Sequence, residues 1–170
     1  MTAIDVVLLT FRLWVAIVII AHGVNHGRTQ DGTAKWFASK GFSSPQLNAR
    51  VSALSEILIG LALIAGLLTS VAAAGLVATM FVAFWSIHRF AGFFNFHRPD
   101  EGWEYVGTLS IIGIALAVLG PGRYSVDEAL GIAGNLDGWV GLAIIGAGVL
   151  VAAGQLAVFW RKPTGTGSSA

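Results

Sequence analysis

Residues 51–87 decide the fold, and they read VSALSEILIGLALIAGLLTSVAAAGLVATMFVAFWSI. Thr69 and Ser70 divide this stretch into apolar runs at 51–68 and 71–87. About 20 apolar residues are needed to cross the ~30 Å of hydrocarbon in a bilayer, and both runs come close to that length. The stretch therefore predicts two antiparallel membrane-spanning helices joined by a tight turn.

Three further apolar runs are expected to span as well: about 4–23, 105–119 and 139–160. The run 105–119 is short for a span and is expected to borrow residues on either side. The whole chain of 170 residues is 55% hydrophobic and only 11% charged, whereas soluble domains carry about 25% charged residues. The sequence predicts an all-α, polytopic transmembrane bundle as one domain over 1–162, followed by a disordered tail at 163–170.

Basic residues are distributed unequally between the two predicted faces. Five crossings put the termini on opposite sides of the membrane, and only Arg123 is basic on the side of the N-terminus. The other side carries eight basic residues: Arg28, Lys35, Lys40, Arg50, Arg89, Arg98, Arg161 and Lys162. Because basic loops stay in the cytoplasm, we expect the N-terminus outside and the C-terminus in the cytoplasm.

The composition excludes several kinds of chemistry. The chain has no cysteine, which removes disulfides, thiolate metal sites, iron–sulfur clusters and a cysteine nucleophile. A net charge of +1 argues against a nucleic-acid partner. A redox role would therefore need an organic cofactor, a haem, a metal held by histidine and carboxylate, or a partner protein.

The predicted topology brings ionisable residues to the cytoplasmic edge. All four histidines lie there: His22, His26, His88 and His97. His22 and His26 are four residues apart and share a helix face. Glu56 lies five residues into the second span, about 7 Å deep. Because small and polar helix faces pack against other helices in lipid, we expect Glu56 to point at the histidines of the first span.

Two of these residues leave alternatives open. On a helical wheel, His88 falls away from the small-residue face of the third span, so its membership of the cluster is less secure. Arg12 lies within ~40° of His26 around the first helix. It is either a contact for a ligand inside the bundle or a structural arginine bonded to backbone carbonyls or to an acid such as Asp127 or Glu128.

Two segments outside the spans have their own patterns. Residues 89–104 read RFAGFFNFHRPDEGWE, and this mixture of aromatic and charged residues is typical of an interfacial or re-entrant segment. With the amphipathic loop 27–50, it is expected to cover a cavity on the cytoplasmic side. Gly120-Pro121-Gly122 ends the fourth span, and Ser125 or Asp127 is expected to cap a short helix.

Short motifs recur in order along the first ~130 residues: Arg12 with His22-Gly23, Lys35-Trp36-Phe37, Gly41-Phe42, Glu56 with Gly60, Gly66-Leu67-Leu68-Thr69, Gly102-Trp103-Glu104-Tyr105 and the stretch from Gly120 to Asp127. In these motifs the chain resembles the DoxX family of small bacterial membrane proteins, which includes relatives of the membrane subunit of thiosulfate:quinone oxidoreductase. The resemblance implies a four-helix core, so the run 139–160 is an additional C-terminal span. Relatives often carry a lysine near the place of His26. The resemblance also implies the bacterial inner membrane and a link to quinone or sulfur redox chemistry beside partner oxidoreductases.

These observations together predict a membrane subunit or accessory of a quinone-linked redox system, with a pocket for a quinone-type headgroup open to the cytoplasm. The residues expected to exchange protons with or orient the headgroup are His22, His26 and Glu56. Those expected to bind it or line the rim are Arg12, His88, His97 and Glu104. A divalent metal and a haem with two histidine ligands are alternative occupants.

Two interpretations compete with this function. The chain is alternatively a non-catalytic membrane anchor or assembly partner for another oxidoreductase or membrane complex, with its aromatic loops as the interface. The histidines are alternatively interfacial residues satisfied by water and backbone carbonyls, because i, i+4 spacing alone is a weak signal for a site.

Overall fold

The structure is a computed structural model that describes residues 2–96 and 101–163. Within these ranges the chain forms helices and one isolated β-bridge between Phe42 and Trp160. The five longer helices are α1 (Ala3–Arg28), α3 (Pro45–Ala65), α4 (Thr69–Ser86), α5 (Glu104–Leu119) and α8 (Gly138–Phe159). The shorter ones are α2 (Gln30–Ser39), the 3₁₀ turn η1 (His88–Phe90), α6 (Val126–Ala129) and α7 (Ala133–Leu136).

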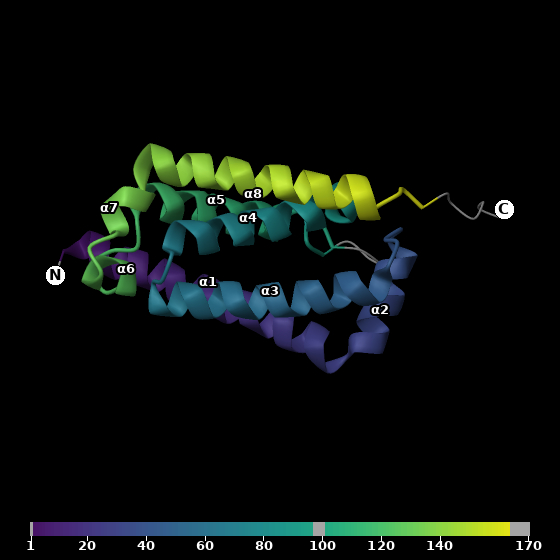
Figure 1. Ribbon diagram of the computed structural model, residues 1–170. Coiled ribbons are helices and arrows are strands. Elements are labelled where there is room, and N and C mark those ends of the chain that lie inside the picture. Colours follow the sequence, from purple (N-terminus) through teal and green to yellow (C-terminus); the bar gives the residue numbers. More distant parts are fainter. Residues whose placement is uncertain (1, 97–100, 164–170) are drawn as a thin grey trace, which may run out of the picture.

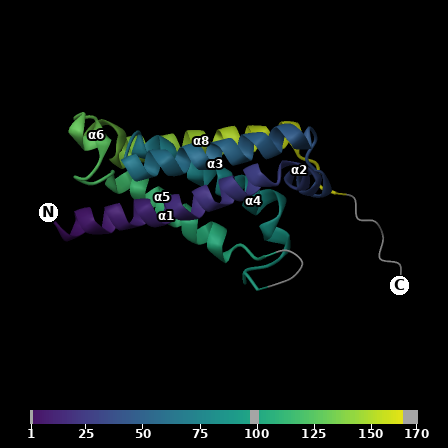
Figure 2. The same ribbon diagram turned by 90° about the horizontal axis from the view of Figure 1, so that it is seen from below.

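The long helices form a two-layered bundle. Helices α1 and α3 lie side by side, while α4, α5 and α8 make the other layer, with α4 in contact with α3, α5 and α8 (Figure 1). Seen from below, α1 crosses the bundle at an angle to α3 (Figure 2). The start of α1 and the end of α8 lie at opposite ends of the bundle in both views.

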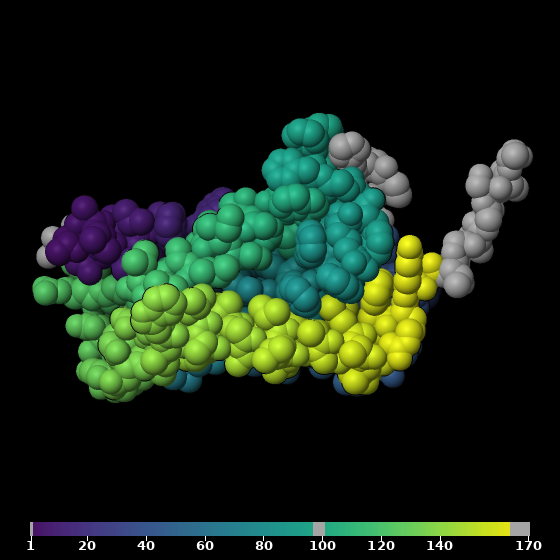
Figure 3. All heavy atoms as spheres, turned by 90° about the horizontal axis from the view of Figure 1, so that it is seen from above, coloured from purple at the N-terminus to yellow at the C-terminus, as the bar shows by residue number. Residues whose placement is uncertain are grey.

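The helices confirm a multi-pass membrane protein. Four of them, α1, α3, α4 and α8, are long and apolar enough to cross a bilayer, whereas α5 is apolar but has only 16 residues. The expectation that this fourth run borrows neighbouring residues is not met, since α5 ends at Leu119, just before Gly120, whose φ is +81°. Helix α4 is the most buried of the five, and α8 shows much of its apolar surface along one side of the bundle (Figure 3).

The ends of the bundle hold more helix than the sequence indicates. The predicted loop 24–50 is largely helical, because α1 continues to Arg28 and α2 then lies across the end of the bundle (Figure 1). Helix α3 begins at Pro45, a position where a missing N–H costs nothing. The α3–α4 turn lies at residues 66–68, three residues earlier than Thr69 and Ser70, and Ser125 caps α6 as predicted by accepting a bond from the Glu128 N–H.

The aromatic segment after α4 folds back on itself. The N–H groups of Gly102, Trp103 and Glu104 donate to carbonyls of residues 92–94 at 3.0–3.1 Å. The atoms that follow α4, coloured teal, stand out from one side of the bundle (Figure 3). Phe90, Phe93, Phe94 and Phe96 are exposed there. Exposed rings at the end of a membrane bundle fit the predicted interfacial segment.

Candidate functional site

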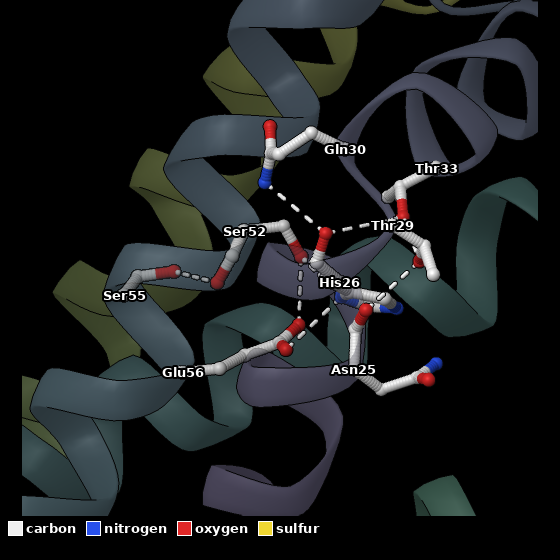
Figure 4. A network of polar contacts seen from close by, with 8 residues as sticks. All are labelled: Asn25, His26, Thr29, Gln30, Thr33, Ser52, Ser55 and Glu56. Atoms are coloured by element: carbon white, nitrogen blue, oxygen red, sulfur yellow. Dashed lines mark hydrogen bonds and ion pairs between the residues drawn. The ribbon is translucent and has the colours of Figure 1, made fainter.

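A buried carboxylate and an imidazole meet where α1 crosses α3. Glu56 is only 3% exposed, and its Oε2 lies 3.1 Å from His26 Nδ1. Its other oxygen, Oε1, accepts a 2.7 Å hydrogen bond from the Ser52 hydroxyl, which lies 3.3 Å from the same Nδ1 (Figure 4). Because the hydroxyl gives its one proton to Glu56, it must accept from Nδ1. The geometry therefore fits an imidazole that carries a proton on Nδ1.

Small and polar residues along α1 and α3 create this meeting point. Asn48, Ser52 and Glu56 recur every four residues and share one face of α3. Gly23, one turn before His26, packs so closely that a Cβ there would lie 2.9 Å from Glu56 Cβ. The prediction that the first two spans face each other, with Glu56 directed at a histidine, is confirmed by this packing.

The pair has unused bonding capacity. Glu56 Oε2 is buried and makes no hydrogen bond of good geometry with a described residue, although His26 Nδ1 lies at ion-pair distance. The carbonyl of His26 is occupied from the other side, since Gln30 and Thr33 of α2 donate to it (Figure 4). A buried acceptor with capacity to spare is costly without a function or a ligand.

One cavity beside the pair, which we name the lateral cavity, has a volume of about 260 Å³ and lies between α3, α4 and α8. His26 and Glu56 are the two ionisable residues in its wall. The other lining residues are Trp36, Phe37, Phe42, Asn48, Val51, Ser52, Ser55, Ile59, Gly75, Ala78, Thr79, Val82, Ala83, Ser86, Ile87, Val151, Ala152 and Gln155. The lateral cavity is thus mainly apolar, with its charged groups at one point of the wall.

A second cavity, which we name the histidine cavity, has a volume of about 270 Å³ and lies between α1, α4 and α5. It shares His26 and Glu56 with the lateral cavity. Its lining residues are Ile19, His22, Asn25, His26, Trp36, Glu56, Thr79, Met80, Ala83, Ile87, His88, Glu101, Tyr105 and Leu109. Six side chains that can gain or lose a proton therefore border one space.

His88 belongs to the histidine cavity, which the helical wheel did not indicate. Helix α4 stops at Ser86, and the backbone turns at Ile87 (φ −130°, ψ −70°) into η1. His88 Nδ1 then lies 2.6 Å from the Glu101 carbonyl, and Nε2 lies 2.9 Å from the Tyr105 hydroxyl. Because the carbonyl only accepts, Nδ1 donates to it, and Nε2 is left to accept from Tyr105.

The remaining predicted site residues have different positions. His22 lines the histidine cavity, with its ring centroid 6.2 Å from that of His26. Glu104 lines neither the lateral nor the histidine cavity, and lies in a separate surface depression beside Trp103. His97 falls outside the described residues. The predicted chemical roles of these residues stay predictions.

The placement of Arg12 in the same pocket was wrong. Arg12 is 1% exposed and donates to four backbone carbonyls: Leu63, Ile64, Pro121 and Tyr124, at 2.6–3.0 Å. These carbonyls belong to the end of α3 and to the loop after α5, and Arg12 lines neither cavity. It shares a helix face with His26 but lies 14 residues away, or about 21 Å along the axis.

Asp127 lies at the same end of the bundle, and we name Arg12 and Asp127, with the backbone groups they bond, the clamp. Its two carboxylate oxygens accept from the N–H groups of Leu68 and Thr69, at 2.7 and 2.8 Å. Asp127 is 1% exposed, and its own N–H donates to the Gly66 carbonyl. These bonds satisfy the first turn of α4, whose N–H groups have no partner within the helix. The structural alternative for Arg12, with backbone carbonyls and a neighbouring Asp127, is the one that the contacts support.

Sequence reasoning missed other residues that shape the cavities. Gln155 of α8 donates a 3.1 Å bond to Asn48 of α3 across the lateral cavity. Tyr105 and Glu101 border the histidine cavity, where Glu104 was expected. An amide in an otherwise apolar span was the available signal for Gln155, because uncharged polar residues in lipid bond across helices.

The donor set gives little support to a metal or a haem. Among the described residues, no three His, Asp or Glu side chains are grouped so that they could hold a metal ion. His22 and His26 lie on one helix with their rings at 74° to each other. Two such neighbours on one helix cannot approach a haem iron from opposite faces.

Comparison with known proteins gives one match. A model of the DoxX family matches residues 7–89, from within α1 to η1. The chain belongs to the DoxX family. No curated protein and no solved structure matches the chain. In this DoxX-family protein the matched segment contains both His26 and Glu56, whereas α5 and α8, which complete the two cavities, lie outside it.

Proposed function

We propose that this DoxX-family protein binds a quinone headgroup at the His26–Glu56 pair and acts as a membrane subunit or accessory of a quinone-linked redox system. The observation that carries the proposal is the buried Glu56 Oε2, which accepts no hydrogen bond from a described residue and borders a mainly apolar cavity. An apolar ring with hydroxyl groups at its edge, as in the quinol form, matches such a cavity, because a hydroxyl can donate to Oε2. Ligand pockets typically combine apolar walls with a few polar groups that fix orientation.

The chemistry of the pair suits this ligand. The Nδ1 proton of His26 is directed at Ser52 and Glu56, while Glu56 Oε2 can still accept a hydrogen bond from a quinol hydroxyl. Reduction to the quinol adds two electrons and two protons, so a bound headgroup needs groups that release and recover protons. Histidine does so near neutral pH. The electrons would come from a partner oxidoreductase that carries a flavin or an iron–sulfur centre.

We also propose that the end of the bundle holding His26 faces the cytoplasm. Support comes from the basic residues, since Arg28, Lys35, Lys40, Arg161 and Lys162 flank the helix ends on that side. A green fluorescent protein fused after Ala170 is expected to fluoresce. Activity of alkaline phosphatase fused at the same place would instead put the C-terminus outside.

Quinone binding by the purified protein tests the proposed function. Decylubiquinol, whose hydroxyls can donate to Glu56, is titrated into the protein in lipid nanodiscs, first with the unchanged chain and then with E56Q and H26A. Loss of a hydrogen bond to a charged group costs about 1.5–3 kcal/mol, so Kd is expected to rise about tenfold to a hundredfold in both variants. E128Q, an exposed carboxylate at the other end of the bundle, serves as the matched control and is expected to leave Kd unchanged.

Three outcomes would overturn the proposal. Equal affinity of E56Q and the unchanged chain would show that the pair does not bind the headgroup. A Soret band in the absorbance spectrum would replace the quinone with haem. A stoichiometric partner protein together with no quinone binding would favour the non-catalytic anchor.

A further inference from the structure

We infer that the two cavities have different contents: the lateral cavity admits the headgroup sideways from lipid, and the histidine cavity holds water that supplies its protons. The inference rests on the proposed function and assigns the two sides of the His26–Glu56 pair to separate tasks. It starts from the observation that Glu56 borders both spaces while the rest of their linings differ in chemistry.

The lateral cavity has an edge that faces lipid. Val51 of α3 is 48% exposed and Val151 of α8 is 73% exposed, and both line the cavity. Helices α3 and α8 both pack on α4, and they meet each other at the Gln155–Asn48 bond. The rings of Phe37 and Phe42 close the cavity toward α2. An apolar molecule therefore reaches the pair between α3 and α8, without passing the charged end of the bundle.

The histidine cavity has the groups that water needs. Apart from the shared pair, the polar groups that border it are His22 of α1, His88 of η1, Glu101 in the segment before α5, and Tyr105 of α5. Ordered water in protein makes about three hydrogen bonds, and these polar groups surround a space large enough for several molecules. Asn25 and Glu101 place its outer rim at the end of the bundle, where the membrane meets water.

Glu56 and His26 are the ionisable part of the wall between the two spaces, which also includes Trp36, Thr79, Ala83 and Ile87. For each quinone reduced, two electrons arrive from the partner oxidoreductase and two O–H bonds form at the headgroup oxygens. The protons leave the pair on the lateral side, and water in the histidine cavity restores them. The titratable groups that face the pair are His22 from α1, His88 from η1, Glu101 from the segment before α5, and Tyr105 from α5.

The absence of native cysteine allows a direct test in the full chain. M80C and L109C place a thiol in the histidine cavity, while A78C and A152C place one in the lateral cavity. In nanodiscs, a cationic methanethiosulfonate is expected to modify the first two at least about tenfold faster, since apolar surroundings suppress the thiolate. Decylubiquinone is expected to slow the reaction of A78C and A152C with N-ethylmaleimide and to leave M80C and L109C unchanged.

The control and the outcomes separate this inference from the proposed function. A147C lies on the lipid-facing side of α8, in neither of the two cavities, and no protection by decylubiquinone is expected there. Protection of M80C and L109C instead, or equally fast reaction of A152C with the cationic reagent, would overturn the assignment while leaving quinone binding intact. If decylubiquinone protects no thiol and decylubiquinol does not bind in the titration, both proposals fail.

Discussion

Two buried ionic groups lie toward opposite ends of the bundle, and they are bonded in different ways. Arg12 donates to four backbone carbonyls, and both oxygens of nearby Asp127 accept from backbone N–H groups. Glu56 instead has one bonded oxygen, one oxygen that accepts no hydrogen bond from the part of the chain that the structure describes, and a cavity on each side. A charge that is fully bonded to backbone holds elements together, whereas a charge with spare capacity beside a cavity is available for a ligand.

The largest effect on stability is expected at Arg12. R12L removes the arginine donor from four buried or partly buried backbone carbonyls and leaves Asp127 without its nearby charge. Removing one side of a buried ionic network costs about 3–5 kcal/mol, which unfolding in an SDS titration would measure. R123L removes an exposed arginine at the same end and is expected to cost less than about 0.5 kcal/mol. An equal loss of unfolding free energy in R12L and R123L would show that the backbone bonds of Arg12 do not hold the bundle together.

A smaller effect is expected at Gly66, which lies between Arg12 and Ser125. Its φ is +65°, and a Cβ there would lie 2.7 Å from Arg12 Cζ and 2.5 Å from Ser125 Cβ. G66A is therefore expected to lower the free energy of unfolding by about 1–3 kcal/mol. G146A adds a methyl in open space on α8 and is expected to stabilise the helix by about 0.5–1 kcal/mol. A G66A protein as stable as the parent would mean that Arg12 and Ser125 can move apart to accept a Cβ at residue 66 without loss of stability.

A single neutral hydrogen bond is tested at Tyr105. Y105F removes the hydroxyl 2.9 Å from His88 Nε2 and keeps the ring that packs against the imidazole. The expected loss in the same SDS titration is about 1 kcal/mol. Y124F, whose exposed hydroxyl lies at the clamp end, is the matched control and is expected to cost nothing measurable. No difference between the two would show that His88 is held by Glu101 alone.

The smallest change in stability is expected at Glu56, although its effect on quinone binding is expected to be large. In E56Q the amide oxygen still accepts from Ser52, and the change removes the 3.1 Å contact of Oε2 with His26 Nδ1, which lacks good hydrogen-bond geometry. The free energy of unfolding is expected to change by about 0.5 kcal/mol, the low end for one net hydrogen bond. A loss comparable to that of R12L would show that Glu56 is as structural as Arg12.

The spans were predictable because lipid demands long apolar segments, and four such helices and the shorter apolar α5 are present at nearly the predicted positions. The convergence of Glu56 on His26 was also predictable. Residues four apart share a helix face, and polar faces turn toward other helices in lipid. These are local rules, so they hold without knowledge of how the helices are arranged.

Other features depended on three-dimensional arrangement. His88 reached its cavity because α4 ends at Ser86, and nothing in its apolar run marks that end. Arg12 was assigned to the pocket from its angle around α1, but its partners are set by where the loop after α5 folds back. The amide of Gln155 gained its importance from α8 packing beside α3 at Asn48, an arrangement that periodicity does not predict.

The 16 residues of α5 have a consequence for the surrounding bilayer. At 1.5 Å per residue α5 is about 24 Å long, several ångströms less than the hydrocarbon of an average membrane. Lipids along the α5 flank must compress to match it, at a cost of a fraction of a kcal/mol for each ångström of hydrophobic mismatch. The protein is therefore expected to gather where acyl chains are short. In long-chain lipids, neighbouring copies are expected to associate through their α5 flanks, because that contact removes the mismatched surface from lipid.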